Sequence, residues 1–362
     1  MNNRIYNFNA GPATLPLEVL QEVQSELLNY QQTGMSVLEI SHRSKPFEAI
    51  NAEAEANLKE LLGIGDNYRV LFLQGGASTQ FATIPMNFLA EGRTADYILT
   101  GSWSEKALKE AKLFGNTHVA ATTADENYKR IPSMDEIKLS ENPAYVHITS
   151  NNTIFGTQWQ KLPKFDNVPL IADMSSDILN KPFNAENFAM IYAGAQKNLG
   201  PSGVTVVIIR NDLLENNPKT LPAMMRYETH AKNNSMYNTP PVFSVYMLNL
   251  VLRWVKAQGG LVAMEKRNVE KAGLVYDTID KSAGFYRGHA AADSRSLMNV
   301  TFRLPSEELE KAFASQAEKA GLVGLKGHRS VGGLRASIYN AMSVAGCQAL
   351  KDFMLDFQQK NG

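Results

Sequence analysis

The sequence predicts an α/β protein: a large domain built on a mainly parallel sheet covered by helices, followed by a smaller α+β domain. Short runs that are apolar at every position, such as Val70–Leu73, or at all positions but one, such as Val204–Ile209 with its Thr205, are typical of strands buried on both faces. They alternate with segments whose apolar residues recur at helical spacing, as in Phe47–Leu61, which ends before Gly63. This alternation indicates a sheet whose strands are joined by crossover helices.

The remaining elements follow the same two patterns along the chain. Between the two runs above, strands are expected at Tyr97–Leu99, Tyr145–Ile148, Leu170–Ala172 and Phe188–Ala193, with helices at Phe81–Leu89 and Glu105–Phe114. From Ser244 to Ile279 the pattern is helical, with a break at Gly259 and Gly260. After this break we expect two further strands and two further helices, in the order strand, helix, strand, helix, at Leu297–Phe302, Ser306–Ala320, Leu334–Ile338 and Val344–Phe357.

These patterns suggest two domains in the chain of 362 residues, which is long enough for two domains of the usual ~100–200 residues. We expect a large domain over residues 16–259 and a small C-terminal domain over residues 260–362. The N-terminal segment, residues 1–15, is expected at the active site or packed on it.

Composition excludes several classes of protein. Lys and Arg together number 36 and so do Asp and Glu, which leaves a formal net charge of 0 and no basic cluster for nucleic-acid binding. The single cysteine, Cys347, cannot form an intramolecular disulfide. No apolar run approaches the ~20 residues of a membrane span, and the N-terminus lacks the pattern of a secretory signal. We therefore expect a cytoplasmic protein with no nucleic-acid or membrane partner.

Three turns that follow predicted strands carry the residues of chemical interest, because ligands of open α/β sheets bind at the carboxyl ends of the strands. The first turn, Gln74–Thr79, is rich in small residues and leads into a helix. A helix N-terminus approached by glycine backbone can hold a phosphate, but an ordinary tight turn would have the same composition. The turn matches neither the dinucleotide-binding nor the P-loop pattern.

The other two turns contain an aspartate and a lysine. Asp173 follows a predicted strand and is either a cap for the next turn or a carboxylate aimed at a cation. Lys197 lies in the loop Ala193–Gly203, where a solvated lysine is the ordinary alternative. Trp103, in the turn Gly101–Trp103, is either a core residue or a flat face for a ring. A lysine, a carboxylate and an anion cradle are together what pyridoxal phosphate requires.

Four segments of the sequence resemble the phosphoserine aminotransferases, a family of fold-type I, class V enzymes that depend on pyridoxal 5'-phosphate. The match runs in order from the first ten residues to the last thirty. The combination of an N-terminal Gly-Pro-Ala, a central lysine loop and a late His-Arg pair is highly specific. The matching segments are Phe8–Ala13, Ser41–Ser44, Ala193–Gly203 and His328–Ser337.

The resemblance implies a role for each matching residue. Lys197 would be the Schiff-base lysine, Asp173 the partner of the pyridinium nitrogen and Trp103 the ring that stacks on the cofactor. The other residues expected to bind the cofactor are Ala77, Ser78, Thr153 and Gln196, with Asn238 and Thr239 supplied by the neighbouring subunit of a homodimer. This chain departs from some members at Ser78, where they carry arginine, and at Ala10, where a serine assists substrate binding and only the backbone is left here.

The residues themselves also suggest how a phosphorylated amino acid would bind. Two of the six histidines are followed directly by arginine, as His42-Arg43 and His328-Arg329. Arginine makes bidentate contacts to phosphate and histidine is a titratable donor, although either pair could be an ordinary surface feature. Arg335 lies inside a predicted strand and needs an anionic partner, for which a substrate α-carboxylate is the obvious candidate.

The expected function is transamination between glutamate/2-oxoglutarate and O-phosphoserine/3-phosphooxypyruvate in serine biosynthesis, by a homodimer with shared active sites and no metal. Whether a phosphorylated hydroxythreonine of pyridoxine biosynthesis is a second substrate stays open. One alternative is another class V enzyme, such as an alanine- or serine-glyoxylate aminotransferase or a cysteine desulfurase. Cys347, however, lies in a helical pattern rather than on a loop. The other alternative is a non-catalytic nucleotide-binding module, which would not need Lys197.

Overall fold

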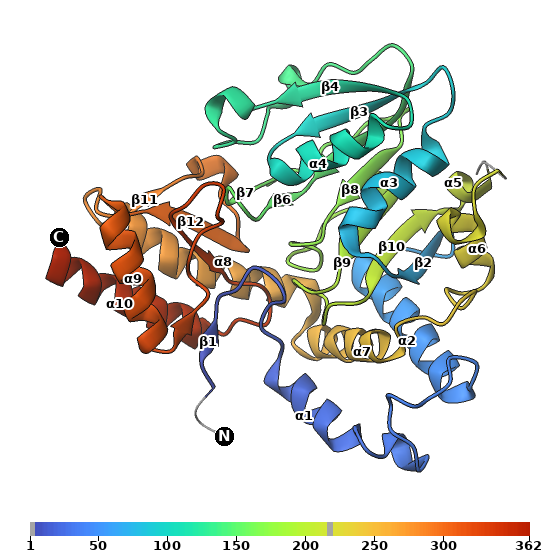
Figure 1. Ribbon diagram of the computed structural model, residues 1–362, viewed down its shortest axis with the longest axis horizontal. Helices are drawn as coiled ribbons and strands as arrows, with labels where there is room; N and C mark the ends of the chain where they lie inside the picture. The colour runs from blue at the N-terminus through green and yellow to red at the C-terminus, as the bar shows by residue number, and fades with distance from the viewer. Residues whose placement is uncertain (1–3, 216–219) are drawn as a thin grey trace.

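The computed structural model describes residues 4–215 and 220–362 and confirms the predicted α/β fold (Figure 1). Its centre is a seven-stranded sheet in the order β2-β10-β9-β8-β5-β3-β4. Strand β10 runs antiparallel to both of its neighbours, and the other strands are parallel to one another. The strands are β2 (Tyr68–Leu73), β3 (Thr94–Leu99), β4 (Asn116–Thr122), β5 (Pro143–Thr149), β8 (Leu170–Asp173), β9 (Met190–Gly194) and β10 (Thr205–Arg210).

The apolar runs arise because helices cover both faces of this sheet. Along β2, Val70 and Phe72 pack in a core that includes residues of α2 (Lys45–Leu62) and α7 (Val242–Ala257). Leu71 and Leu73 point to the other face, in a core with residues of α3 (Gly76–Phe88) and α4 (Ser102–Ala111). The remaining helices before α7 are α1 (Leu17–Glu26), α5 (Asn211–Glu215) and α6 (Tyr227–Lys232).

The C-terminal part of the chain has a separate core around a small antiparallel sheet, β11 (Arg287–Gly288), β12 (Asn299–Arg303) and β14 (Leu334–Ser337). The helices α8 (Gly260–Asp280), α9 (Glu307–Lys319) and α10 (Val344–Asn361) supply much of that core. The N-terminal segment joins it, because β1 (Tyr6–Asn7) pairs with β13 (Leu322–Val323) and Phe8 is buried there. Residues 1–3 of that segment lie outside the described residues.

Helix α8 contributes to two of the three cores. Its Leu261 lies in the core on the α2 and α7 face of the large sheet, and its Val275 lies in the C-terminal core. The predicted domain boundary after residue 259 coincides with the start of this helix and stays a prediction. Within residues 4–215 and 220–362, no helix has both the length and the apolar character needed to cross a bilayer.

Among the elements that the sequence patterns missed are strand β4 and helix α1, and the start of helix α3 was misplaced. Strand β4 was not predicted because it is a partly exposed edge strand of mixed composition, paired only with β3. Helix α1 was also missed. Helix α3 begins at Gly76, five residues before the predicted start at Phe81, because its first turn is made of small residues with no apolar periodicity.

A lysine of α8 is fully buried in the C-terminal part of the chain. Lys271 Nζ donates hydrogen bonds to the backbone oxygens of Ile338 (2.9 Å) and Tyr339 (2.6 Å), just after β14. Burial lowers the pKa of this ammonium from 10.5 to about 7.

This shift predicts a pH dependence of stability. Between about pH 7 and pH 10.5 the unfolded chain binds a proton at Lys271 that the folded chain does not, so raising the pH stabilises the fold. We expect the free energy of unfolding of the wild type, relative to Lys271→Met, to increase from pH 7 to pH 9. Urea denaturation at several pH values measures it, and a difference that stays flat or falls would contradict the shift.

Candidate active site

Five parallel strands bring the predicted site residues to one edge of the large sheet. The segments that follow β2, β3, β5, β8 and β9 all leave the sheet at its carboxyl edge, because these strands run in the same direction. These segments carry the residues that are predicted to bind the cofactor of their own subunit. They are Ala77 and Ser78 after β2, Trp103 after β3, Thr153 after β5, Asp173 at the end of β8, and Gln196 and Lys197 after β9.

Lys197 is half-buried in the turn after β9 and is covered by the N-terminal segment. The amide of Ala13 donates to the carbonyl of Gln196 (2.9 Å), which fixes the segment against this turn. A Cβ on Gly11, whose φ is +149°, would lie 3.4 Å from Lys197 Cγ, so glycine lets the backbone pass close to the lysine. The segment 1–15 was predicted at the site or packed on it, and residues 11–13 lie against the turn that contains Lys197.

Lys197 and Asp173 are close enough for their charges to interact. The Asp173 carboxylate is buried, and its Oδ1 accepts a hydrogen bond from the Ser175 amide (2.9 Å), so Asp173 also caps the turn as one alternative predicted. Burial raises the pKa of Asp173, and the charge of Lys197 opposes that rise. Burial lowers the pKa of Lys197, Asp173 opposes this, and the nearby Arg335 lowers it further. Burial therefore disfavours the ionised form of both side chains.

Thr153 connects Trp103, the ring predicted to stack on the cofactor, to Arg335, the arginine predicted to bind a carboxylate. Its hydroxyl accepts from Trp103 Nε1 (3.1 Å), and its carbonyl accepts from an Arg335 Nη (3.0 Å). Lys197 Nζ lies 5.3 Å from the centroid of the Trp103 ring. Arg335 Nε is buried without a hydrogen-bond partner among the described residues, and burial lowers the pKa of this guanidinium. An unpaired buried donor on a cation is what an anionic ligand would satisfy.

The first turn of α3 fits an anion. Gly75 caps the helix with φ +90°, and among the described residues no side-chain cap bond satisfies the first amides, so these donors could serve a ligand. Thr79 turns its hydroxyl to the Gly75 carbonyl (2.9 Å), and a Cβ on Gly75 would lie 2.1 Å from that hydroxyl oxygen. Glycine is therefore required at this cap. Ala77 and Ser78 lie in the first turn of the helix, whose backbone amides are the donors described above.

The late His-Arg pair lies in the loop before β14. His328 and Arg335 line a cavity of about 270 Å³ together with Phe155 and His289. His328 Nδ1 is bonded to the Ser330 hydroxyl (2.7 Å), while Arg329 is exposed. Burial lowers the pKa of His328, and the positive charges of Arg335 and Arg329 lower it further. A bound anion would be stabilised by these neighbouring positive charges.

The early His-Arg pair, His42 and Arg43, lies near the two residues that are predicted to bind the cofactor of the neighbouring subunit, Asn238 and Thr239. His42 and Thr239 line the same shallow pocket, and Gln74 Nε2 donates to the Thr239 carbonyl (3.0 Å). Asn238 lies in an adjoining groove with Gly75. Within the described residues, no hydrogen bond or ion pair joins this group, or Arg43, to Lys197 or Arg335. Within one chain, Asn238 and Thr239 thus lie beside the segment that begins α3.

Two features near the site were not predicted. Lys106 Nζ lies 4.2 Å from the centroid of the Trp103 ring, and on the sequence it was only a residue of a helical segment. Tyr339 donates its hydroxyl to the carbonyl of Ala10 (2.7 Å), 329 residues away in the sequence. Cys347 lies in a helix, α10, as predicted, and is fully buried in the C-terminal core; burial raises the pKa of its thiol to about 12, which disfavours a reactive thiolate.

Comparison with known proteins places the chain in a family. Residues 5–350 match the model of the class-V aminotransferases. A phosphoserine aminotransferase of Herpetosiphon aurantiacus is 63% identical, with 99% of each chain covered. The crystal structure of a phosphoserine aminotransferase from Bacillus circulans subsp. alkalophilus is 60% identical with a TM-score of 0.98, each chain being covered completely. That of a PLP-bound phosphoserine aminotransferase from Trichomonas vaginalis is 40% identical with a TM-score of 0.92, covering 97% of this chain and 100% of that one. The chain therefore belongs to the phosphoserine aminotransferases within the class-V aminotransferase family.

Proposed function

We propose that this protein uses pyridoxal 5'-phosphate to transfer the amino group between glutamate and 3-phosphooxypyruvate, giving 2-oxoglutarate and O-phosphoserine in serine biosynthesis. The observation that carries the proposal is the meeting of Lys197, Asp173 and Arg335 at the carboxyl edge of the sheet. Their charges interact, and each has the chemistry that this transamination needs. The family membership of the chain supports the same substrates.

The residues at the sheet edge fit the cofactor. The uncapped amides at the start of α3, with Ala77 and Ser78, would hold its phosphate. Asp173 would pair with the ring nitrogen, Trp103 would cover one face of the ring, and Thr153 and Gln196 would complete the site. When bound, the cofactor supplies an electron sink for the carbanion formed at the substrate Cα.

Lys197 has two tasks in this proposal: it anchors the cofactor covalently, and its amino group then carries the proton removed from the substrate Cα. A lysine of ordinary pKa is almost entirely protonated at neutral pH and is a poor base. Burial and the charge of Arg335 lower the pKa of Lys197, which increases the neutral fraction available to accept the proton. Asp173, in turn, would be held ionised by a cationic ring nitrogen beside it.

Two groups of cations would select the substrate. Arg335 offers its unpaired Nε to the α-carboxylate that every amino-acid substrate carries. His328 and Arg329 would bind the phosphate from the same chain, with His42 and Arg43 contributed across a dimer. The backbone of Ala10, held by Tyr339, would contact the substrate as well.

A substrate panel tests the proposed function. The purified holoenzyme is assayed with O-phospho-L-serine, L-serine, L-alanine and L-cysteine as donors and 2-oxoglutarate as acceptor. We expect kcat/KM for O-phospho-L-serine to exceed that for L-serine by at least about 10², the value of two charged hydrogen bonds. Equal activity on both would reject the phosphorylated substrate, and sulfur release from L-cysteine would favour the desulfurase alternative.

We also propose that the protein is a cytoplasmic homodimer of two-domain chains, with domains over residues 16–259 and 260–362. Within the described residues of one chain, no hydrogen bond or ion pair joins His42 or Thr239 to Lys197, which leaves these residues available to a site completed by the partner subunit. Asn238 and Thr239 of one subunit would then hold the cofactor phosphate at Lys197 of the other.

Subunit mixing tests this shared site. Lys197→Ala and Asn238→Ala/Thr239→Ala chains, each nearly inactive alone, are allowed to exchange subunits to a random population. Half of the dimers are then mixed, and in a two-fold arrangement one site of each collects both defects while the other collects neither. About a quarter of all sites should recover activity. If Asn238 and Thr239 serve their own chain, no activity returns.

A further inference from the structure

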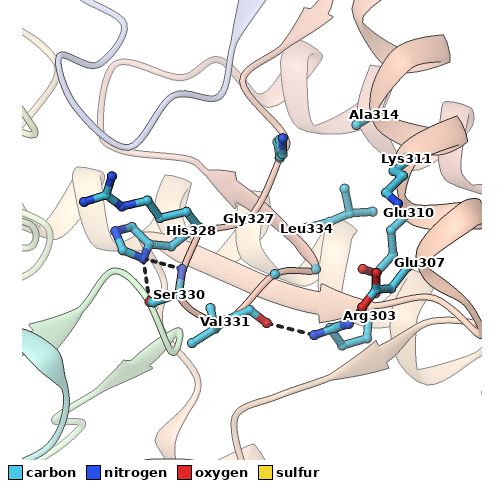
Figure 2. A pocket seen from close by; sticks show the side chains of 14 residues that line it. Arg303, Glu307, Glu310, Lys311, Ala314, Gly327, His328, Ser330, Val331 and Leu334 are labelled. Atoms are coloured by element: carbon cyan, nitrogen blue, oxygen red, sulfur yellow. Dashed lines mark hydrogen bonds and ion pairs between the residues drawn. The ribbon is translucent and has the colours of Figure 1, made fainter.

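The loop that carries His328 and Arg329 is held from its other side by an arginine of β12. An Arg303 Nη donates to the carbonyl of Val331 (2.8 Å), and Arg303 Nε donates to Glu310 Oε1 on α9 (2.6 Å). Figure 2 shows Val331 between His328 and Arg303, with Glu310 beside the arginine. Arg303 thus connects the loop to a helix of the C-terminal part of the chain.

The glycines of the loop allow this close approach. Gly332 and Gly333 have φ of +70° and +68°, values that favour glycine. A Cβ on Gly333 would lie 2.5 Å from Arg303 Cδ, and one on Gly332 would lie 3.4 Å from an Arg303 Nη. The loop therefore packs its backbone directly on the Arg303 side chain.

The position of Arg303 is itself fixed by a buried carboxylate. Glu310 is only 7% exposed, and its Oε1 also accepts from the amide of Leu304 (3.3 Å), the residue after Arg303. A guanidinium bonded to such a group loses little further freedom when it binds a carbonyl. The Arg303 side chain is 43% exposed, so it is the ion pair with Glu310 that holds the guanidinium in place to donate to the loop.

Backbone hydrogen bonds transmit this restraint to the His-Arg pair. The amides of Val331 and Gly332 both donate to the carbonyl of His328, at 3.0 and 2.8 Å. The carbonyl of Gly333 accepts from the amide of Gly327 (2.8 Å), which closes the base of the loop. Holding the carbonyl of Val331 therefore restrains the backbone on which His328 and Arg329 are mounted.

We propose that Arg303, oriented by Glu310, is a positioning residue that sets His328 and Arg329 for the phosphate group of the substrate. This inference rests on the proposed function, because it assumes that the His-Arg pair binds phosphate. Arg303 has no need to touch the substrate: its guanidinium is already engaged on both sides, by α9 and by the loop. Its effect is on the placement of the pair and hence on binding of the phosphorylated substrate.

The test compares Arg303→Ala and Arg303→Lys with Arg287→Ala. Arg287 pairs with Arg303 in the β11–β12 ladder and donates to the Leu304 carbonyl, so it is a matched arginine of the same small sheet. For Arg303→Ala we expect KM for O-phospho-L-serine to rise about tenfold with kcat changed less than about twofold, and kcat/KM for L-serine unchanged. Arg303→Lys keeps one of the two contacts and should give about a threefold rise in KM. Arg287→Ala should leave both constants near those of the wild type.

Hydrogen exchange of the holoenzyme gives a readout independent of turnover. The amides of residues 327–333 should exchange faster in Arg303→Ala than in the wild type or in Arg287→Ala, while the sheet strands stay protected. If the wild type itself shows no preference for O-phospho-L-serine over L-serine, the proposed function has failed. If that preference exists but Arg303→Ala matches Arg287→Ala in KM and exchange, or lowers kcat/KM for both substrates equally, the positioning role is overturned. Should Arg303→Ala fail to fold, Arg303→Lys decides by the same criteria.

Discussion

Replacing Lys197 by alanine is expected to lower turnover by roughly 10⁴-fold or more, since both the covalent anchor of the cofactor and the carrier of the Cα proton disappear. The fold should survive, because Lys197 is a half-buried turn residue that lies outside the three hydrophobic cores formed by the described residues. Steady-state assays with O-phospho-L-serine and 2-oxoglutarate measure the loss. Thermal unfolding of the same preparation separates it from misfolding.

Lys197→Arg is the matched control for charge. It keeps a cation beside Asp173, but a guanidinium cannot form the bond to the cofactor and does not deprotonate near neutral pH. We therefore expect Lys197→Arg to be as inactive as Lys197→Ala. Activity retained by Lys197→Arg would mean that only the positive charge matters, which contradicts the role given to the amine.

The second large effect is expected at the phosphate-binding pair. Hydrogen bonds to charged groups contribute roughly 1.5–3 kcal/mol each, so removing two of them with His328→Ala/Arg329→Ala should lower kcat/KM for O-phospho-L-serine by about 10²–10⁴. Activity on L-serine should barely change, because it has no phosphate to lose. The ratio of the two kcat/KM values is the quantity to measure.

Arg335→Ala and Arg43→Ala complete this test. Arg335→Ala should lower kcat/KM for O-phospho-L-serine and for L-serine alike, because both substrates carry the α-carboxylate. If the partner subunit completes the site, Arg43→Ala should lower kcat/KM only for the phosphorylated substrate. A preference for O-phospho-L-serine that survived both Arg43→Ala and Arg329→Ala would mean that the His-Arg pairs are ordinary surface features.

Much of the fold was predictable because its signals are local. The central strands of the large sheet are mostly apolar since helices cover both faces, and α2 ends at Gly63, as the sequence indicated, with that residue in the left-handed conformation. The strand ends followed from the same reasoning, which is why Asp173 and Lys197 could be singled out before the structure. The edge strand β4 carries no such signal.

The contacts that complete the site could not be predicted, because they join residues far apart in sequence. The bond from Arg335 to the Thr153 carbonyl spans 182 residues, and that from Tyr339 to Ala10 spans 329. Arg303 illustrates the same limit: as a residue at the end of a short strand it had no distinguishing pattern. Only the fold brings it against the glycines before β14.

Borohydride reduction of the holoenzyme, followed by peptide mapping, tests the central claim most directly. Reduction makes the bond between the cofactor and its lysine permanent, so mass spectrometry of the digest identifies that lysine. The account predicts a single modified peptide that contains Lys197, and none in Lys197→Arg. A cofactor adduct on any other lysine, such as Lys106 beside the Trp103 ring, would contradict the assignment of the active site.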